Sequence, residues 1–192
     1  SFSKQLGEFF NSQNVRTVFL ETDTVSLSAF SSLKKRLPDF AFSSDEKLQS
    51  LITKQRSIKS AEEIALIKKA QKMTDETFSY ILNNISAGRT EREVMLDMEF
   101  YMRHLGSEGV SFDFIMVSGK NSSMPHGVPT DKKIEKGDFI TMDFGAVCGG
   151  YRSDMTRTVA VGAVSEEQRL VYDTVLAAQN AALAAVCAGK IC

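Results

Sequence analysis

The sequence of 192 residues contains few cysteines and no long run of apolar residues. Its three cysteines, Cys148, Cys187 and Cys192, are odd in number and lack CxxC spacing, which is typical of unligated thiols in a reducing compartment. No apolar stretch approaches the length that crosses a bilayer, and the N-terminal SFSKQLGEFF lacks the charged-then-apolar order of a secretory signal. We therefore expect a cytoplasmic protein with no membrane partner.

A run of charge of one sign is also missing. Lys and Arg total 23 against 24 Asp and Glu, so no basic surface for nucleic acid is predicted, and the 43% hydrophobic content is ordinary for a globular protein. The segment 143–145 spells the DFG of protein kinases, but no HRD loop or glycine-rich phosphate loop precedes it. No serine lies in a GxSxG elbow either, so kinase and serine-hydrolase chemistry are both excluded.

Residues 1–56 and 57–192 show different patterns. The first part alternates strand patterns at 15–20 and 40–42 with helix patterns at 27–37 and 45–53, too few strands for a complete small α/β domain. We assign it to the C-terminal part of an N-terminal α/β domain. The second part contains a strand pattern at 112–117, a polar loop at 118–130 and an alanine-rich helix after 165, the order of an α+β domain. Its helices are predicted to begin at capping boxes, Ser60/Glu63, Thr90/Glu93 and Ser165/Gln168.

The segment 137–161 is predicted to form a β-hairpin that carries two aspartates on one face. Both arms alternate with the period of strands. If Cys148 and Gly149 form a two-residue turn, Asp143 stands directly opposite Asp154, with Cβ atoms about 4.5–5.5 Å apart. If Gly149 and Gly150 form it, Asp143 faces Thr156 and Asp154 is a diagonal neighbour on the same face. A turn-capping role for one Asp and a solvated role for the other is the alternative to a site.

Like charges paired across a sheet destabilise it, whereas divalent cations bind such hard oxygen ligands, so Asp143 and Asp154 are candidate metal ligands. His126 lies in a Pro-His-Gly turn shortly before the hairpin. A histidine held there and partly exposed suits a proton donor or an oxyanion partner, and an ordinary surface turn residue is the alternative.

Two segments, RSIKSAEEIALIKKA and SGKNSSMPHGVPTDKKIEKGDFITMDFGAVCGGYRSDMTRTVAVG, together resemble the pita-bread metallopeptidase family, in its Xaa-Pro dipeptidase and Xaa-Pro aminopeptidase branch. The likeness covers about residues 54–192. It implies that the chain holds the first half of a pita-bread catalytic domain, preceded by the tail of a creatinase-like N-terminal domain.

The resemblance also implies roles for individual residues. Asp143 binds one ion of a dinuclear centre and Asp154 bridges both ions, with Mn²⁺ expected and Co²⁺ or Zn²⁺ as alternatives. His126 matches the family histidine that stabilises the tetrahedral intermediate. Thr156, in the DxTRT segment on the Asp154 face, is expected to support the ligands, whereas Arg157 points the other way and is structural.

The family needs one further His and two Glu as ligands, downstream of the DxTRT segment, and no His follows His126 in this sequence. We therefore expect a fragment that is inactive by itself, with exposed apolar surface, from a protein that cleaves peptides with proline after the scissile bond and forms a homodimer. Dipeptidase and aminopeptidase activities stay open. A creatinase-like amidinohydrolase, which the aspartate pair disfavours, and a non-catalytic pita-bread module that binds proteins are the competing hypotheses.

Overall fold

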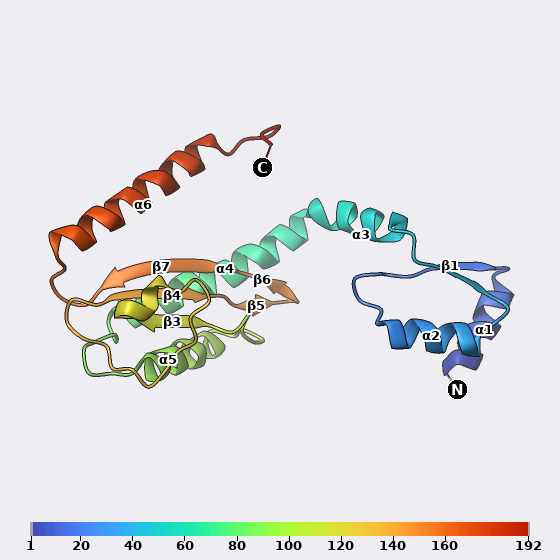
Figure 1. Ribbon diagram of the computed structural model, residues 1–192, viewed down its shortest axis with the longest axis horizontal. Helices are drawn as coiled ribbons and strands as arrows, with labels where there is room; N and C mark the ends of the chain where they lie inside the picture. Colours follow the sequence, from blue (N-terminus) through green and yellow to red (C-terminus); the bar gives the residue numbers. More distant parts are fainter. Residues whose placement is uncertain (1, 192) are drawn as a thin grey trace. The chain divides into compact units, whose positions relative to one another are not determined.

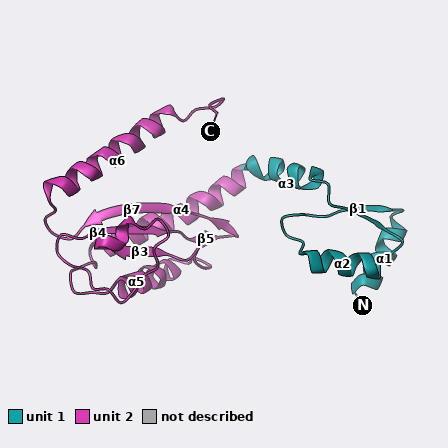
Figure 2. Ribbon diagram, in the orientation of Figure 1, with its two compact units in different colours: residues 1–60 teal, residues 61–192 magenta. Residues whose placement is uncertain are grey.

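The computed structural model describes residues 2–191, and the chain divides into two compact units, residues 1–60 and 61–192 (Figure 2). This division lies beyond the boundary at 56/57 expected from the sequence. Helix α3 (Lys47–Ser57), expected to end near residue 53, continues to Ser57. None of the helices within residues 2–191 combines the length and apolar character of a membrane span.

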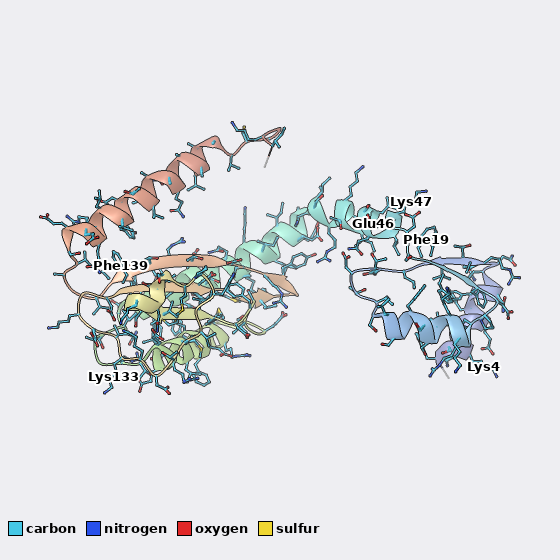
Figure 3. All side chains as sticks on the ribbon, in the orientation of Figure 1. Lys4, Phe19, Glu46, Lys47, Lys133 and Phe139 are labelled. Carbon is cyan, nitrogen blue, oxygen red and sulfur yellow. The ribbon has the colours of Figure 1, made fainter. Side chains whose placement is uncertain are left out.

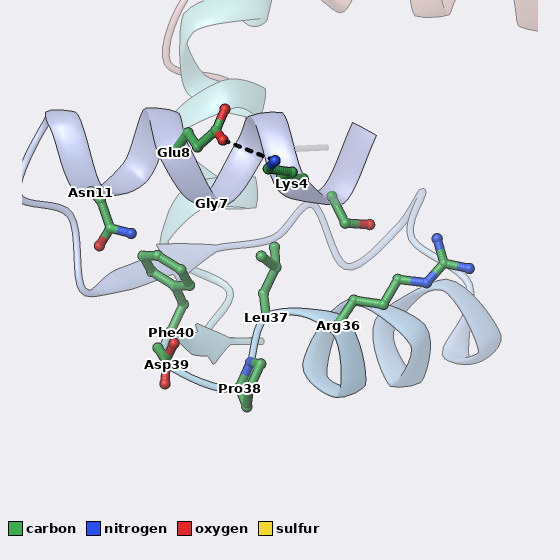
Figure 4. Close-up of a pocket in the computed structure, with 10 residues that line it drawn as sticks. Lys4, Gly7, Glu8, Asn11, Arg36, Leu37, Pro38, Asp39 and Phe40 are labelled. Atoms are coloured by element: carbon green, nitrogen blue, oxygen red, sulfur yellow. Dashed lines mark ion pairs between the residues drawn. The ribbon is translucent and has the colours of Figure 1, made fainter. Parts of the chain in front are cut away.

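The first unit is a small α/β arrangement. Helix α1 (Phe2–Ser12) precedes strand β1 (Thr17–Phe19), helix α2 (Leu27–Arg36), strand β2 (Ala41–Ser43) and α3, and the two strands pair in parallel. Each strand and helix expected from the sequence is present, and α1 was not expected. Helix α1 packs closely at Gly7, where an added Cβ would lie 3.1 Å from Leu37 Cδ2. Beside α1 lies an open groove of about 790 Å³. Lys4 and Glu8, which line this groove, form an ion pair (Figure 4).

The second unit packs helices α4 (Ala61–Leu82) and α5 (Glu91–His104) with a three-stranded antiparallel sheet (Figure 1). The sheet order is β3 (Ile115–Ser118), β4 (Phe139–Phe144) and β7 (Met155–Ala160), so β4 is central. The remaining elements are the 3₁₀ helix η1 (Gly119–Ser123), the strands β5 (Val147–Cys148) and β6 (Tyr151–Arg152), and helix α6 (Glu166–Ala185).

The core of this unit follows the alternation of β4. Ile140, Met142 and Phe144 are fully buried, and Met98 and Met102 of α5 are buried in the same cluster. The opposite face of β4 presents the intermediate, partly exposed side chains of 139, 141 and 143. The side chains of the whole unit are drawn in Figure 3, and α6 contributes none to the buried set.

Helix starts agree with the capping boxes. At α5, Glu93 N–H donates to Thr90 Oγ1 (3.1 Å) and Thr90 N–H donates to Glu93 Oε2 (2.7 Å). At α6, Ser165 and Gln168 make the same reciprocal pair, at 3.1 and 2.8 Å. Boundaries elsewhere shift: β3 begins at 115 rather than 112, the predicted loop opens with η1, and α6 ends at Ala185 rather than near 189.

The hairpin uses Gly149–Gly150 as its turn, so the register that places Asp143 opposite Thr156 is confirmed and the Cys148–Gly149 turn is wrong. Both glycines have positive φ, +58° and +78°, as a type I′ turn requires. The turn is also held from outside, because the Glu108 carboxylate accepts the N–H groups of Gly149 (2.6 Å) and Gly150 (3.3 Å).

Between the β4/β7 ladder and the β5/β6 ladder, the two arms of the hairpin lie unusually close together. A Cβ added to Gly145 would lie 1.9 Å from the Ser153 carbonyl oxygen, so the backbone of one arm occupies that space. One backbone bond of the ladder remains here, from Ser153 N–H to the Ala146 carbonyl (3.0 Å). Side-chain hydroxyls supply the others: Ala146 N–H donates to Ser153 Oγ (2.9 Å), and Ser111 Oγ donates to the carbonyls of Ser153 (2.6 Å) and Ala146 (2.9 Å). This bend separates Asp143 on β4 from Asp154 just before β7.

We expect Gly145→Ala to destabilise the second unit by at least about 2 kcal/mol, because the obstructing atom is backbone and the arms must separate. The free energy of unfolding in urea measures this. Gly109→Ala is the matched control, since an added Cβ there meets nothing within 4 Å. Equal stability of the two variants would contradict the close approach.

Candidate metal centre

Three of the predicted site residues line one cavity of about 690 Å³. Asp143 comes from the central strand β4, Asp154 from the residue that precedes β7, and His126 from the turn after η1. The rest of the wall is largely apolar and includes Phe112, Phe114 and other side chains of the segments 110–115 and 127–129. The structure therefore brings two carboxylates and an exposed imidazole to one partly apolar hollow.

The two carboxyl groups act on each other. Partial desolvation of its carboxyl group raises the pKa of Asp154, and the charge of Asp143 together with a hydrogen bond between the two carboxyl groups raises it further. Asp143 Oδ1 is buried and has no hydrogen-bond partner among the described residues. A buried acceptor without a donor costs about 1–3 kcal/mol. A cation between these carboxylates would supply the missing partner and remove the repulsion, so the pair fits a divalent ion.

Thr156 stands directly opposite Asp143 in the ladder and shares its face of the sheet. It is exposed and is not part of the cavity wall formed by the described residues, so a supporting role for Thr156 stays a prediction. Arg157 faces Met142 in the register, on the other side, and its guanidinium donates to the carbonyl of Thr156 (2.8 Å).

Within residues 2–191 no group of three or more His, Cys, Asp or Glu side chains is arranged to hold a metal. The roles of Asp143, Asp154 and His126 stay predictions.

Sequence reasoning missed three charged residues of the cavity wall, Arg92, Glu99 and Asp113. Arg92 and Glu99, with Met95, follow the spacing i, i+3, i+7, which places them on one face of α5. Arg92 is already engaged, because its Nε lies 3.0 Å from Asp131 Oδ1. Helical spacing could have placed Arg92 and Glu99 on one face, but the sequence does not indicate that this face meets the hairpin.

The fold and the paired carboxylates together define a metallopeptidase scaffold, and comparison with known proteins gives the family. The model of metallopeptidase family M24 matches residues 65–192, about two thirds of the chain. The chain belongs to family M24 and has its pita-bread fold, as the resemblance predicted. Membership in this family implies divalent metal ions.

Relatives carry names from one branch of the family. The chain is 39% identical over 173 residues to the Xaa-Pro dipeptidase of Pyrococcus furiosus, covering 90% of this chain and 49% of the relative. Among solved structures, an Xaa-Pro dipeptidase from Bacillus anthracis superposes with a TM-score of 0.88 at 38% identity, over 93% of this chain and 49% of that one. An X-Pro aminopeptidase from Thermotoga maritima gives 0.84 at 37%, over 94% and 50%. The chain thus spans about half the length of these relatives.

We expect Asp154→Asn to stabilise the metal-free protein at neutral pH, because the amide removes one charge and can donate to the Asp143 carboxylate. The gain is at most about 1 kcal/mol, since Asp154 is exposed and solvent screens the repulsion. With Mn²⁺ added, the unsubstituted protein should become the more stable of the two. It keeps both carboxylates, and an ion that binds the folded state stabilises that state.

Thermal midpoints with EDTA and with Mn²⁺ measure both effects. Asp173→Asn, at an exposed position on α6, is the control and should respond to neither treatment. A lower midpoint of Asp154→Asn in EDTA, or an equal response of both variants to Mn²⁺, would argue against a shared cation.

Proposed function

We propose that this chain supplies half of the active site of a metal-dependent peptidase that hydrolyses the bond preceding proline. The observation that carries the proposal is the meeting of Asp143, Asp154 and His126 at one cavity in a chain of family M24. The names of its relatives, Xaa-Pro dipeptidase and X-Pro aminopeptidase, support the substrate class. Whether the substrate is a dipeptide or the N-terminus of a longer peptide is left open.

In this proposal Asp143 and Asp154 hold two divalent ions, with Mn²⁺ preferred over Co²⁺ and Zn²⁺. Such ions, when bound, lower the pKa of water and polarise the scissile carbonyl. His126 lies on an exposed turn of the cavity wall, where its ring can donate a hydrogen bond to the oxyanion that develops at that carbonyl. The apolar wall around Phe112 and Phe114 excludes water and suits a proline ring.

Two carboxylates leave an ion held weakly, so the remaining ligands are expected from sequence outside residues 1–192. We therefore expect the chain by itself to be inactive, and the longer protein to be a homodimer, as the family resemblance implies. A pita-bread module that binds proteins without catalysis, or a creatinase-like amidinohydrolase, would also use this scaffold. The paired carboxylates are what favour the metal-dependent peptidase.

In the protein extended beyond Cys192, we expect Mn²⁺-stimulated cleavage of Xaa-Pro dipeptides or of peptides with proline in second position. Asp154→Ala and Asp143→Ala should abolish it, because each removes a ligand. His126→Ala should lower kcat about 10²- to 10³-fold with a smaller effect on KM, as removal of an oxyanion donor does. Rates of proline release at saturating and limiting substrate measure both constants.

Asp23→Asn, in an exposed turn of the first unit, is the control and should keep full activity. No metal-stimulated cleavage, with the Asp154→Ala variant indistinguishable from the unsubstituted protein, would remove the peptidase proposal. Turnover of creatine without metal would favour the amidinohydrolase instead.

A further inference from the structure

Glu91, the first residue of α5, is a fully buried carboxylate that the proposed chemistry does not use. Its oxygens accept five hydrogen bonds from three residues: from Ser118 N (2.7 Å), Ser118 Oγ (3.0 Å), Asn121 Nδ2 (3.3 Å), Thr130 N (3.0 Å) and Thr130 Oγ1 (2.7 Å). All five donors belong to the segment 118–130, and none belongs to α5. Glu91 therefore serves that segment rather than its own helix.

The two carboxylate oxygens of Glu91 bind different ends of this loop. Oε1 binds Ser118, at the end of β3, and Asn121 in η1. Oε2 binds Thr130, where the chain leaves the loop. One buried carboxylate thus closes a loop of which the exposed turn carries His126.

A role in the helix dipole does not explain this arrangement. An acidic side chain in the first turn contributes about 0.3–1 kcal/mol from an exposed position and needs no burial. The first turn of α5 has such a residue in Glu93, which completes the capping box with Thr90. Glu91 and Glu93 therefore have different roles: Glu93 caps the helix, and Glu91 binds the loop.

Glu91 is kept charged by its donors. Burial would raise its pKa, but the hydrogen bonds from Thr130 and Ser118 outweigh burial, and the pKa lies below the ordinary value. The network extends to one cation, because Lys132 Nζ donates to Ser118 Oγ (3.0 Å) and pairs with Asp138 Oδ2 (2.8 Å). At neutral pH all five donors therefore face an ionised acceptor.

The Thr130 end is also tied to α5 by the hydrogen bond from Arg92 N–H to the Thr130 carbonyl (3.1 Å). Between its ends the loop is held mainly by local hydrogen bonds, such as Ser122 Oγ to the Gly119 carbonyl (2.6 Å) and Met124 N–H to the Asn121 carbonyl (3.0 Å). Thr141 Oγ1 and the Ser122 carbonyl oxygen are 3.5 Å apart, at the limit of a hydrogen bond, and Gly127 N–H donates locally to the Met124 carbonyl (3.2 Å). Gly127 packs closely against Val117, where an added Cβ would lie 2.8 Å from Cγ1. The place of the His126 turn therefore depends on how the ends are held.

We propose that Glu91 is a positioning residue: by closing the loop 118–130 it holds the turn of His126 against the cavity that contains Asp143 and Asp154. The effect expected on kcat rests on the proposed function. The effect expected on the loop 118–130 rests on the geometry alone. An amide in place of the carboxylate has one acceptor oxygen and turns an N–H₂ group toward donors, so Glu91→Gln should release one end of the loop.

The test compares Glu91→Gln with Glu93→Gln, a matched control that keeps the capping box because glutamine is also accepted there. In the protein extended beyond Cys192 we expect Glu91→Gln to lower kcat at least about 10-fold with KM changed less than about 2-fold, and Glu93→Gln to change neither. In a His126→Ala background, Glu91→Gln should cost no further activity, because it acts through His126.

Amide hydrogen exchange gives the readout that is independent of activity. We expect exchange in 118–130 to rise at least about 10-fold in Glu91→Gln while the strands of 139–160 stay unchanged. If Glu91→Gln folds poorly, Glu91→Asp, which keeps the charge but is one methylene shorter, should show the same pattern at smaller size.

Different results overturn different claims. No peptidase activity in the unsubstituted protein would overturn the proposed function, and exchange would still decide whether Glu91 closes the loop. Equal exchange of 118–130 in Glu91→Gln and Glu93→Gln would overturn the closure. A loss of kcat that is as large in the His126→Ala background as in the native one would overturn positioning and leave Glu91 a stabilising residue.

Discussion

The close approach of Gly145 to the carbonyl of Ser153 is the constraint on which the candidate site depends. No side chain fits between the two arms there. Ser153 N–H still donates to the Ala146 carbonyl (3.0 Å), whereas Ala146 N–H bonds to the Ser153 hydroxyl and Ser111 Oγ donates to the Ser153 carbonyl. Asp143 precedes this bend and Asp154 follows it. The two aspartates thus flank the close approach, one on each arm, and both line the same cavity.

The candidate site lowers the stability of the metal-free fold. Asp143 has a buried oxygen without a donor in the part of the chain that the structure describes, and the pKa of Asp154 is raised by partial desolvation and by its neighbour's charge. A fold that needed only stability would place an apolar or amide side chain at one of these positions. In the proposed metal site a divalent ion would give the compensating gain, because it would turn two repelling carboxylates into ligands.

Local patterns in the sequence were enough for much of the fold. The capping boxes gave the starts of α5 and α6, and the alternation of β4 gave both its buried face and the common face of Asp143 and Thr156. The choice of turn could not be made, because Cys148–Gly149 and Gly149–Gly150 are both short and flexible. What distinguishes them is tertiary: the Glu108 carboxylate accepts both glycine N–H groups. Arg92 and Asp113 were missed for the same reason, since the cavity forms only when α5 meets the hairpin.

Helix α5 links the two halves of the site through acidic residues at its two ends. Glu91 at its start closes the loop that carries His126, and Glu108, shortly after its end, holds the turn of the hairpin that carries Asp143 and Asp154. Neither lines the cavity formed by the described residues. At 1.5 Å per residue, α5 is about 20 Å long, and Glu108 lies four residues beyond its last residue, His104. Because Met98 and Met102 are buried in the core, α5 gives the loop and the hairpin a common support, in addition to the contact of Thr141 with the Ser122 carbonyl.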